Sequence, residues 1–192
     1  MLTVCCPLTR EDAVTTHFIG SRNITVALPP PDAMTLFTPE GERSWAGQDG
    51  WNPQYPVPSR TFGVGAVFTT QHQGRPTIWV IVDQEPDRIR YARITPHGLA
   101  GTVEVRALSG SHASTTVRVT YDLTALTDDA IVELAGFAAG YHVEIDTWAT
   151  DIAESLARRG TAPPAVVTAN RDADKPVYQA RTRPSDNGTE KR

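Results

Sequence analysis

The sequence predicts an α+β fold in which a run of antiparallel strands precedes one long C-terminal helix. Residues 127–159 carry the only long helical period of the chain. Between residues 65 and 124, segments of strand character alternate with short turn sequences. At a rise of about 1.5 Å per residue the helix is roughly 45 Å long, enough to cross a whole sheet diagonally.

The first strand is expected at residues 13–28. Apolar residues of one parity predict a strand with one buried face, and they are Phe18, Ile24, Val26 and Leu28. Gly20 interrupts this pattern, which suggests a bulge. The three prolines at residues 29–31 end the strand.

Two short helices are expected after this strand. Residues 32–37 form the first, with Met34 and Phe37 at i, i+3 spacing. Thr38 then caps a second helical turn, with Pro39 at its first helical position.

The following segment, AGQDGWNPQYPVPSRT at residues 46–61, is dense in glycine and proline yet holds Trp51 and Tyr55. A loop that keeps such aromatic residues normally docks them. They either plug an edge of the core or line the mouth of a pocket. We favour the plug, because aromatic side chains usually serve packing.

Five further strands are expected at residues 65–72, 77–84, 88–95, 101–108 and 115–124. The turns between them are short enough to join consecutive antiparallel strands, so the strands form a meander. The last two strands alternate apolar and polar residues, which predicts one dry and one wet face. Residues 78–82 are apolar on both parities, which predicts a strand near the centre of the sheet.

The long helix has well-signalled ends. Thr127 caps its first turn, and Arg158, Arg159 and Gly160 supply the stop. An apolar stripe at three- and four-residue steps consists of Ile131, Leu134, Ala138, Tyr141, Ile145, Trp148, Ile152 and Leu156. This stripe must be buried.

Gly136 and Gly140 lie inside the helix and are expected to face away from the stripe, each at a cost of about 1 kcal/mol relative to alanine. With Val132, Ala139 and Val143 they form a back face of small residues. Either this face admits another backbone, from a loop or from the second subunit of a homodimer, or the glycines mark a local bend.

Length and composition predict one domain with tails. The chain has 192 residues, of which 40% are hydrophobic and 21% charged, so it is long enough for a substantial core. We expect a flexible leader at residues 1–12, the domain at residues 13–159 and a disordered tail at residues 160–192. Val177 and Tyr178 are the exception, because they suggest a short contact within the tail.

Charge and hydropathy exclude several classes of protein. The net charge of −4 indicates no basic surface for nucleic acid. No segment approaches the roughly 20 apolar residues of a membrane span, and the first ten residues lack the pattern of a signal peptide, so we expect a cytoplasmic location. Cys5 and Cys6 are the only cysteines, too few for a disulfide framework or a zinc site.

Four segments carry a resemblance to a known superfamily: PPPDAMTLFTPEGERSW, GWNPQY, FTTQHQGRPTIWVIVDQEPDRIRYARITP and TVRVTYDLTAL. Together with the order of elements, they resemble the START/Bet v 1-like (SRPBCC) superfamily over roughly residues 14–156. They are similar to a bacterial SRPBCC group and not to one defined enzyme. The resemblance implies a helix-grip fold, in which a curved antiparallel sheet wraps around the C-terminal helix.

This resemblance also implies a cavity between sheet and helix that holds a hydrophobic ligand. Members of the superfamily include lipid and hormone carriers, polyketide cyclases, Hsp90 co-chaperones and Rieske oxygenases, and the fold alone does not choose among them. The five histidines of this chain are scattered, which argues against an iron site. We expect no metal and no cofactor.

Large side chains on the helix stripe and on the inward parities of the strands are expected to line this cavity. The alternative is that they form ordinary core. The ligand-binding candidates, several of which have a polar tip that could orient a ligand, are Trp51, Phe68, Trp79, Tyr91, Tyr121, Tyr141, Ile145 and Trp148.

Tyr91, Arg93 and His142 are the candidates for catalysis. If Tyr91 points inward, Arg93 shares its parity and does so too. We favour the opposite arrangement, with Arg93 in water, because an unpaired buried guanidinium is rare. His142 flanks the helix stripe, where it either reaches the cavity rim as a general base or is a partly exposed structural residue. His72 is expected in solvent.

The leading hypothesis is therefore the binding of a small hydrophobic or aromatic ligand between sheet and helix. One alternative is a cofactor-independent cyclase, dehydratase or isomerase of the polyketide type, which would use the polar residues of the cavity. The other is an interaction module of the Hsp90-activator type.

Overall fold

The computed structural model describes residues 15–46, 51–56, 62–72 and 74–160. These residues belong to one compact unit. The expectations for the leader, for Cys5 and Cys6 and for residues 161–192 lie outside the described ranges.

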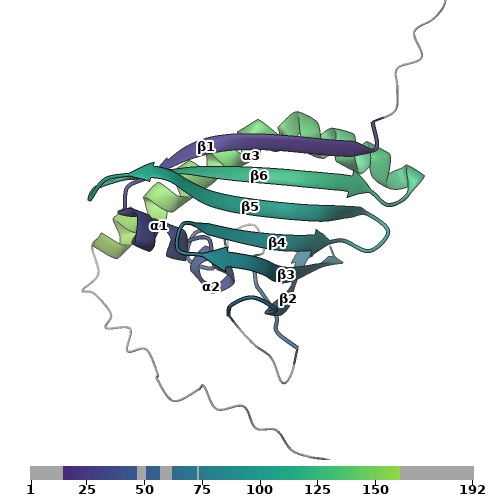
Figure 1. The fold of residues 1–192 in the computed structure, drawn as a ribbon. Coiled ribbons are helices and arrows are strands. Elements are labelled where there is room, and N and C mark those ends of the chain that lie inside the picture. The colour runs from purple at the N-terminus through teal and green to yellow at the C-terminus, as the bar shows by residue number, and fades with distance from the viewer. Residues whose placement is uncertain (1–14, 47–50, 57–61, 73, 161–192) are drawn as a thin grey trace, which may run out of the picture. The chain divides into compact units, whose positions relative to one another are not determined.

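The structure consists of one antiparallel sheet, two short helices and one long C-terminal helix (Figure 1). The strands are β1 (His17–Val26), β2 (Val67–His72), β3 (Arg75–Glu85), β4 (Arg88–Ile94), β5 (Leu99–Gly110) and β6 (Thr115–Ala125). Their order in the sheet is β1-β6-β5-β4-β3-β2. The predicted meander is confirmed, and β1 extends it at one edge of the sheet by pairing with β6.

The β-bulges of the sheet lie at positions other than Gly20, where one was predicted. The pairing of β1 with β6 is continuous through Gly20, so the bulge expected there is absent. A Cβ at Gly20 would lie 2.4 Å from Cζ of Phe18 and 3.0 Å from Cδ1 of Tyr141, so this glycine makes room for aromatic rings. The register shifts instead at Val82 in β3 and Leu108 in β5. Such bulges bend a strand and increase its twist.

The prediction that residues 78–82 lie near the centre of the sheet is wrong. Strand β3 is second from an edge, with only β2 outside it. Trp79 and Ile81 face the core, whereas Ile78 and Val80 are partly exposed and Val82 is 43% exposed. A strand that is apolar on both parities therefore has one face in partial contact with water, which is common for apolar residues at protein surfaces.

The two short helices are α1 (Pro30–Thr35) and α2 (Pro39–Glu42). Helix α1 begins two residues earlier than expected, because a proline is well suited to the first turn of a helix. The predicted cap of α2 is confirmed, since Oγ1 of Thr38 accepts a hydrogen bond of 3.0 Å from the backbone N–H of Gly41.

Helix α3 (Asp128–Gly160) matches its prediction closely. Every residue of the predicted stripe is buried or partly buried. The helix makes its main contacts with β1, β6 and, to a smaller extent, β5 (Figure 1). It therefore covers one half of the sheet and leaves the inner face of the other half without a helix partner. No described helix is long and apolar enough to span a membrane.

Candidate functional site

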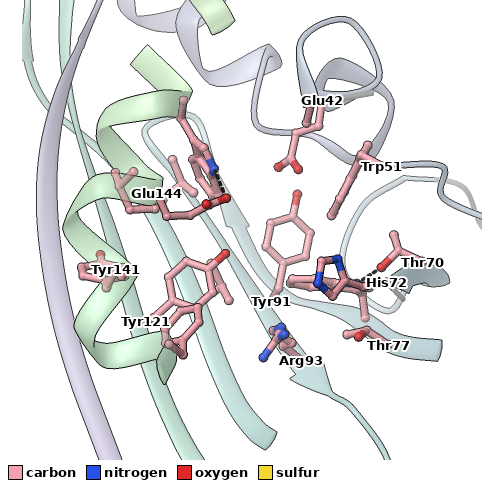
Figure 2. Close-up of a pocket in the computed structure, with 18 of the residues that line it drawn as sticks. Glu42, Trp51, Thr70, His72, Thr77, Tyr91, Arg93, Tyr121, Tyr141 and Glu144 are labelled. Atoms are coloured by element: carbon pink, nitrogen blue, oxygen red, sulfur yellow. Dashed lines mark hydrogen bonds between the residues drawn. The ribbon is translucent and has the colours of Figure 1, made fainter. Parts of the chain in front are cut away.

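A cavity of about 440 Å³ lies under the half of the sheet that α3 leaves free (Figure 2). Strands β2 to β6, helix α3 and the segment that begins at the end of α2 all contribute to its wall. The lining residues are Glu42, Trp45, Ala46, Trp51, Thr70, Gln71, His72, Thr77, Trp79, Tyr91, Arg93, Val103, Val105, Tyr121, Gly136, Phe137, Gly140, Tyr141, Glu144, Ile145, Trp148 and Asp151. Its volume falls in the range of about 300–1,000 Å³ that is typical of small-molecule sites.

Phenylalanine, tyrosine and tryptophan supply eight of the 22 residues of the cavity wall. All four tryptophans of the chain line it, namely Trp45, Trp51, Trp79 and Trp148. Trp79 and Tyr91 meet edge to face, with ring centroids 6.0 Å apart, and Trp45 lies 5.3 Å from Trp148. Each indole N–H is donated to a protein oxygen, at 2.9 to 3.4 Å. The indoles are thus held in place and present apolar surface to the cavity.

Trp51 fulfils both functions considered for the loop that carries it. Its ring packs edge to face on Phe68 and Trp79, which plugs the core edge, and it also lines the cavity. The ring of Tyr55 packs against that of Phe68, with centroids 6.0 Å apart, and Tyr55 does not line the cavity.

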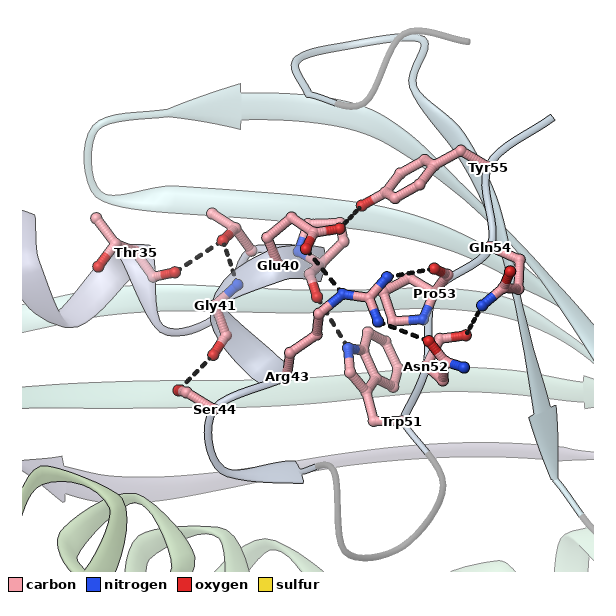
Figure 3. A network of polar contacts seen from close by, with 12 residues as sticks. Thr35, Glu40, Gly41, Arg43, Ser44, Trp51, Asn52, Pro53, Gln54 and Tyr55 are labelled. Carbon is pink, nitrogen blue, oxygen red and sulfur yellow. Dashed lines mark hydrogen bonds and ion pairs between the residues drawn. The ribbon is translucent and has the colours of Figure 1, made fainter. Parts of the chain in front are cut away.

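A polar network fastens this loop to α2 (Figure 3). The Arg43 guanidinium donates to Oδ1 of Asn52 at 2.6 Å and to the backbone oxygen of Pro53. The hydroxyl of Tyr55 donates to Glu40 at 2.6 Å. Burial and this hydrogen bond raise the pKa of Tyr55. One wall of the cavity is therefore a docked loop.

Arg93 points inward, so the preferred prediction that it lies in water is wrong. Its guanidinium carbon lies 5.8 Å from the centroid of the Trp79 ring, and Nη1 is buried with no hydrogen-bond partner among the described residues. Burial lowers the pKa of Arg93. Tyr91, which is 4% exposed, shares its parity, and the alternation of the strand overrides the cost of burying the charge.

The residue paired with Arg93 on the neighbouring strand is a glycine that the close approach of the β6 backbone requires. Gly101 of β5 pairs with Arg93 in the register of the sheet. A Cβ at Gly101 would lie 1.8 Å from the backbone oxygen of Asp122, so the backbone at this point tolerates no side chain.

Glu42, at the end of α2, is a lining residue that the sequence did not reveal. It is 7% exposed, and its carboxyl group makes no hydrogen bond within the described part of the chain. Burial raises its pKa well above the usual range, so the neutral acid is favoured. Figure 2 shows Glu42 and Arg93 at opposite ends of the cavity, with the rings of Tyr91 and Tyr121 between them.

The three candidate tyrosines differ in what their hydroxyl groups do. Tyr91 donates to the backbone oxygen of Phe37 at 2.7 Å, and Tyr141 donates to that of Val119 at 2.8 Å. The Tyr121 hydroxyl makes no side-chain hydrogen bond with any described residue, and it points into the cavity in Figure 2. Burial raises the pKa of Tyr121, and it raises that of Tyr141 to about 12. Of the three, Tyr121 has the hydroxyl that is free to contact a ligand.

Comparison with known proteins identifies the fold. No protein-family model and no curated protein matches the sequence. Norcoclaurine synthase from Thalictrum flavum, solved in complex with dopamine and hydroxybenzaldehyde, is 11% identical, with a TM-score of 0.54 over 82% of this chain and 95% of that one. Protein MLL2253 from Mesorhizobium loti is 16% identical, with a TM-score of 0.52 over 74% and 97% of the two chains. The chain has the Bet v 1-like helix-grip fold.

Two candidates from the sequence lie outside the helix-grip cavity. His142 is exposed on α3 and does not line it, so of the two alternatives for this residue the structure favours the structural one. Phe68 is fully buried and stacks on Trp79 with centroids 6.0 Å apart, which makes it a core residue behind the wall. The other ligand-binding candidates all line the cavity, and their contact with a ligand stays a prediction.

Three lining residues were expected to face elsewhere. His72 is exposed as predicted, yet it also contributes to the cavity wall, because β2 ends there. Gly136 and Gly140 were expected on the back of the helix, but both line the cavity, and a Cβ at either would meet nothing within 4 Å. Val132 and Val143 do face solvent, at 77% and 71% exposure. The second subunit considered for that face stays a prediction.

Proposed function

We propose that this protein binds a small aromatic molecule in the cavity between the sheet and α3. The observation that carries the proposal is the placement of all four tryptophans of the chain around one cavity of about 440 Å³. Planar aromatic surfaces favour planar ligands, which stack or meet them edge to face. A single flexible acyl chain would use these walls less well and would lose more conformational entropy on binding.

The fold neighbour gives this proposal limited support. Norcoclaurine synthase has been solved with dopamine and hydroxybenzaldehyde, which are both small aromatic compounds. At 11% identity the likeness concerns the fold, so the proposal for this chain rests on its own lining residues.

Native mass spectrometry tests the proposal. The full chain is incubated with a mixed extract of lipids and aromatic metabolites, desalted and sprayed under native conditions. We expect adducts whose masses correspond to small aromatic compounds. A protein that stays unliganded in every extract would contradict the proposal, and so would one that retains only acyl lipids.

Two variants on α3 test whether a bound ligand lies in the cavity. Gly140→Leu places a side chain at the cavity wall, in space that is empty in the structure, and should reduce the adduct. Ala139→Leu, next to it on the exposed side of the helix, is the matched control and should bind as the unmodified protein does. Equal binding by both variants would show that the ligand lies elsewhere.

Enzymatic proton transfer is the second candidate, and the neutral acid of Glu42 favours it. A neutral carboxyl group can donate to a ligand carbonyl. The exposed carboxyl group of Glu144, which lines the cavity from α3, is the base that we propose for the adjacent carbon-bound proton. This is the chemistry of a cofactor-independent isomerase, dehydratase or cyclase. Of the three residues first considered for it, Tyr91 is engaged with Phe37 and His142 is outside, so Arg93 alone remains.

Hydrogen–deuterium exchange tests this second candidate. The probe is 2-tetralone, an aromatic ketone whose α-protons exchange with D₂O and are observed by NMR. We expect the protein to accelerate exchange, and Glu42→Gln to reduce the acceleration by about 10²-fold or more. Exchange at the buffer rate would remove this candidate without affecting ligand binding. The Hsp90-activator-like alternative has no support among the described residues.

A further inference from the structure

Arg93 at one end of the cavity has unused capacity for binding an anion. A guanidinium has five N–H donors in a planar fork that matches a carboxylate. Within the described structure, Nη1 is buried and has no acceptor, and no side-chain ion pair involves Arg93. The contact with the Trp79 ring, 5.8 Å away, stabilises the cation without satisfying its N–H groups.

The acidic groups around Arg93 do not neutralise it. Glu133 of α3 forms an ion pair of 2.9 Å with Arg75. The positive charge of Arg75 repels that of Arg93 and so lowers the pKa of Arg93. Glu42, on the far side of the cavity in Figure 2, is in the neutral form that burial favours. The buried Nη1 of Arg93 is therefore left without a close anionic partner among the described residues, which is costly unless an anion completes the site.

A second hydrogen-bond donor is available near the same end. The Tyr121 hydroxyl faces the cavity without a side-chain partner among the described residues, and the phenol is close enough to Arg93 for each group to influence the pKa of the other. The rings of Trp79 and Tyr121 each form part of the cavity wall. The arrangement offers a cation and a neutral donor for an anionic group, and flat surfaces for the ring that carries it.

We propose that the ligand is an aromatic carboxylate whose carboxylate group binds the Arg93 guanidinium while its ring lies between Trp79 and Tyr121. This inference rests on the proposed function and narrows its ligand class. A carboxylate fits better than a bulkier phosphate or sulfonate ester, because one flat end group suits the planar fork beside the Trp79 ring.

Isothermal titration calorimetry of the full chain with two matched probes tests this proposal. 2-Naphthoate and 2-naphthamide have nearly the same shape and differ in the charge of the end group. We expect naphthoate to bind at least about tenfold more tightly, since hydrogen bonds to charged groups contribute more than neutral ones.

Variants on the two faces of β4 identify the residue responsible. Arg93→Met should remove the preference for naphthoate and leave the affinity for naphthamide within about threefold. Arg90→Met changes an exposed arginine on the outer face of the same strand and should keep the full preference. If Arg93→Met does not give the native circular dichroism spectrum, Arg93→Gln replaces it in the same comparison.

The outcomes separate this proposal from the one on which it rests. Equal affinities of the unmodified protein for both probes would overturn the carboxylate assignment and leave the aromatic cavity intact. A preference that persists in Arg93→Met, or that is lost in Arg90→Met, would overturn the assignment to Arg93. Failure of both probes to bind would contradict the proposed function as well.

Discussion

The two halves of the sheet use the same helix in different ways. Over β1 and β6, helix α3 packs directly on the sheet, and Tyr121 and Tyr141 of this core form its border with the cavity, which they also line. Beside β4, β3 and β2 it stands away, and the intervening space is a cavity whose far wall is α2 and the docked loop. The first half carries the main packing of α3 on the sheet, and the second half contains the cavity that we propose as the binding site.

The two halves also differ in how their polar groups are satisfied. In the closed half, the Tyr141 hydroxyl is bonded to the backbone of β6. In the open half, Arg93 has an unpaired Nη1, and the Glu42 carboxyl group makes no hydrogen bond among the described residues. Gln84 and Arg88 of the described structure also carry a buried unpaired atom, but of these three residues only Arg93 lines the cavity, where an unpaired polar group is typical of a functional site.

The largest effect is expected from Tyr141→Ala in the closed half. Tyr141 is 1% exposed, contacts the rings of Phe18, Tyr121 and Phe137, and loses a buried hydrogen bond on truncation. We expect a loss of about 3–5 kcal/mol in the free energy of unfolding, measured by urea denaturation. Tyr141→Phe serves as the control and should lose only about 1 kcal/mol.

A smaller loss in the free energy of unfolding is expected from Trp148→Ala, about two helical turns further along the same stripe of α3. Trp148 is only partly buried, because its ring borders the cavity and packs on Trp45. We expect urea denaturation to show a loss of about 1.5–3 kcal/mol. A loss as large as that of Tyr141→Ala would mean that the two halves are packed alike.

Glu42→Gln should change how stability depends on pH. Because burial raises the pKa of Glu42 in the folded state, the unfolded state loses its proton first, above about pH 4.3. The folded protein is therefore progressively destabilised as pH rises from there towards the folded-state pKa. Relative to the unmodified protein, Glu42→Gln should gain about 1–2 kcal/mol between pH 5 and pH 7 in urea denaturation. A parallel pH dependence of the two proteins would show that Glu42 is not buried.

The smallest effect is expected from Arg93→Met in the absence of ligand. Removing a buried cation without a partner and keeping most of its volume should raise the free energy of unfolding by about 1 kcal/mol. The melting temperature reports this gain, and Arg90→Met on the outer face should leave it unchanged. Destabilisation by Arg93→Met would indicate that the arginine serves the fold and not a ligand.

Periodicity explains why most of the fold could be predicted. The strands from β2 to β6 and helix α3 lie within a few residues of their expected bounds, because alternation and the 3.6-residue period are local signals. The prediction that residues 78–82 lie near the centre of the sheet was wrong because it also used only a local signal. Apolar residues on both faces indicate low polarity, whereas strand order depends on long-range pairing.

The site was less predictable, because it depends on burial created by distant segments. The sequence around Glu42 is polar, and its burial arises only when α2 and the docked loop close over the cavity. Arg93 was assigned to solvent by the rule that unpaired buried charges are rare, and this rule fails at the cavity, where Nη1 is buried without a partner among the described residues. Trp79, Tyr121 and Trp148 were found because aromatic residues on an inward parity are visible in the sequence.

The most direct test of the aromatic cavity is an NMR titration that observes the indole N–H groups. The chain has four tryptophans, all of which line the cavity, so its ¹H–¹⁵N spectrum should contain four indole signals that single Trp→Phe variants can assign. On addition of 2-naphthamide, we predict that these four signals shift more than the backbone amides of β1 in the closed half. Indole signals that stay in place, or shifts centred on β1, would contradict a ligand site in the open half of the sheet.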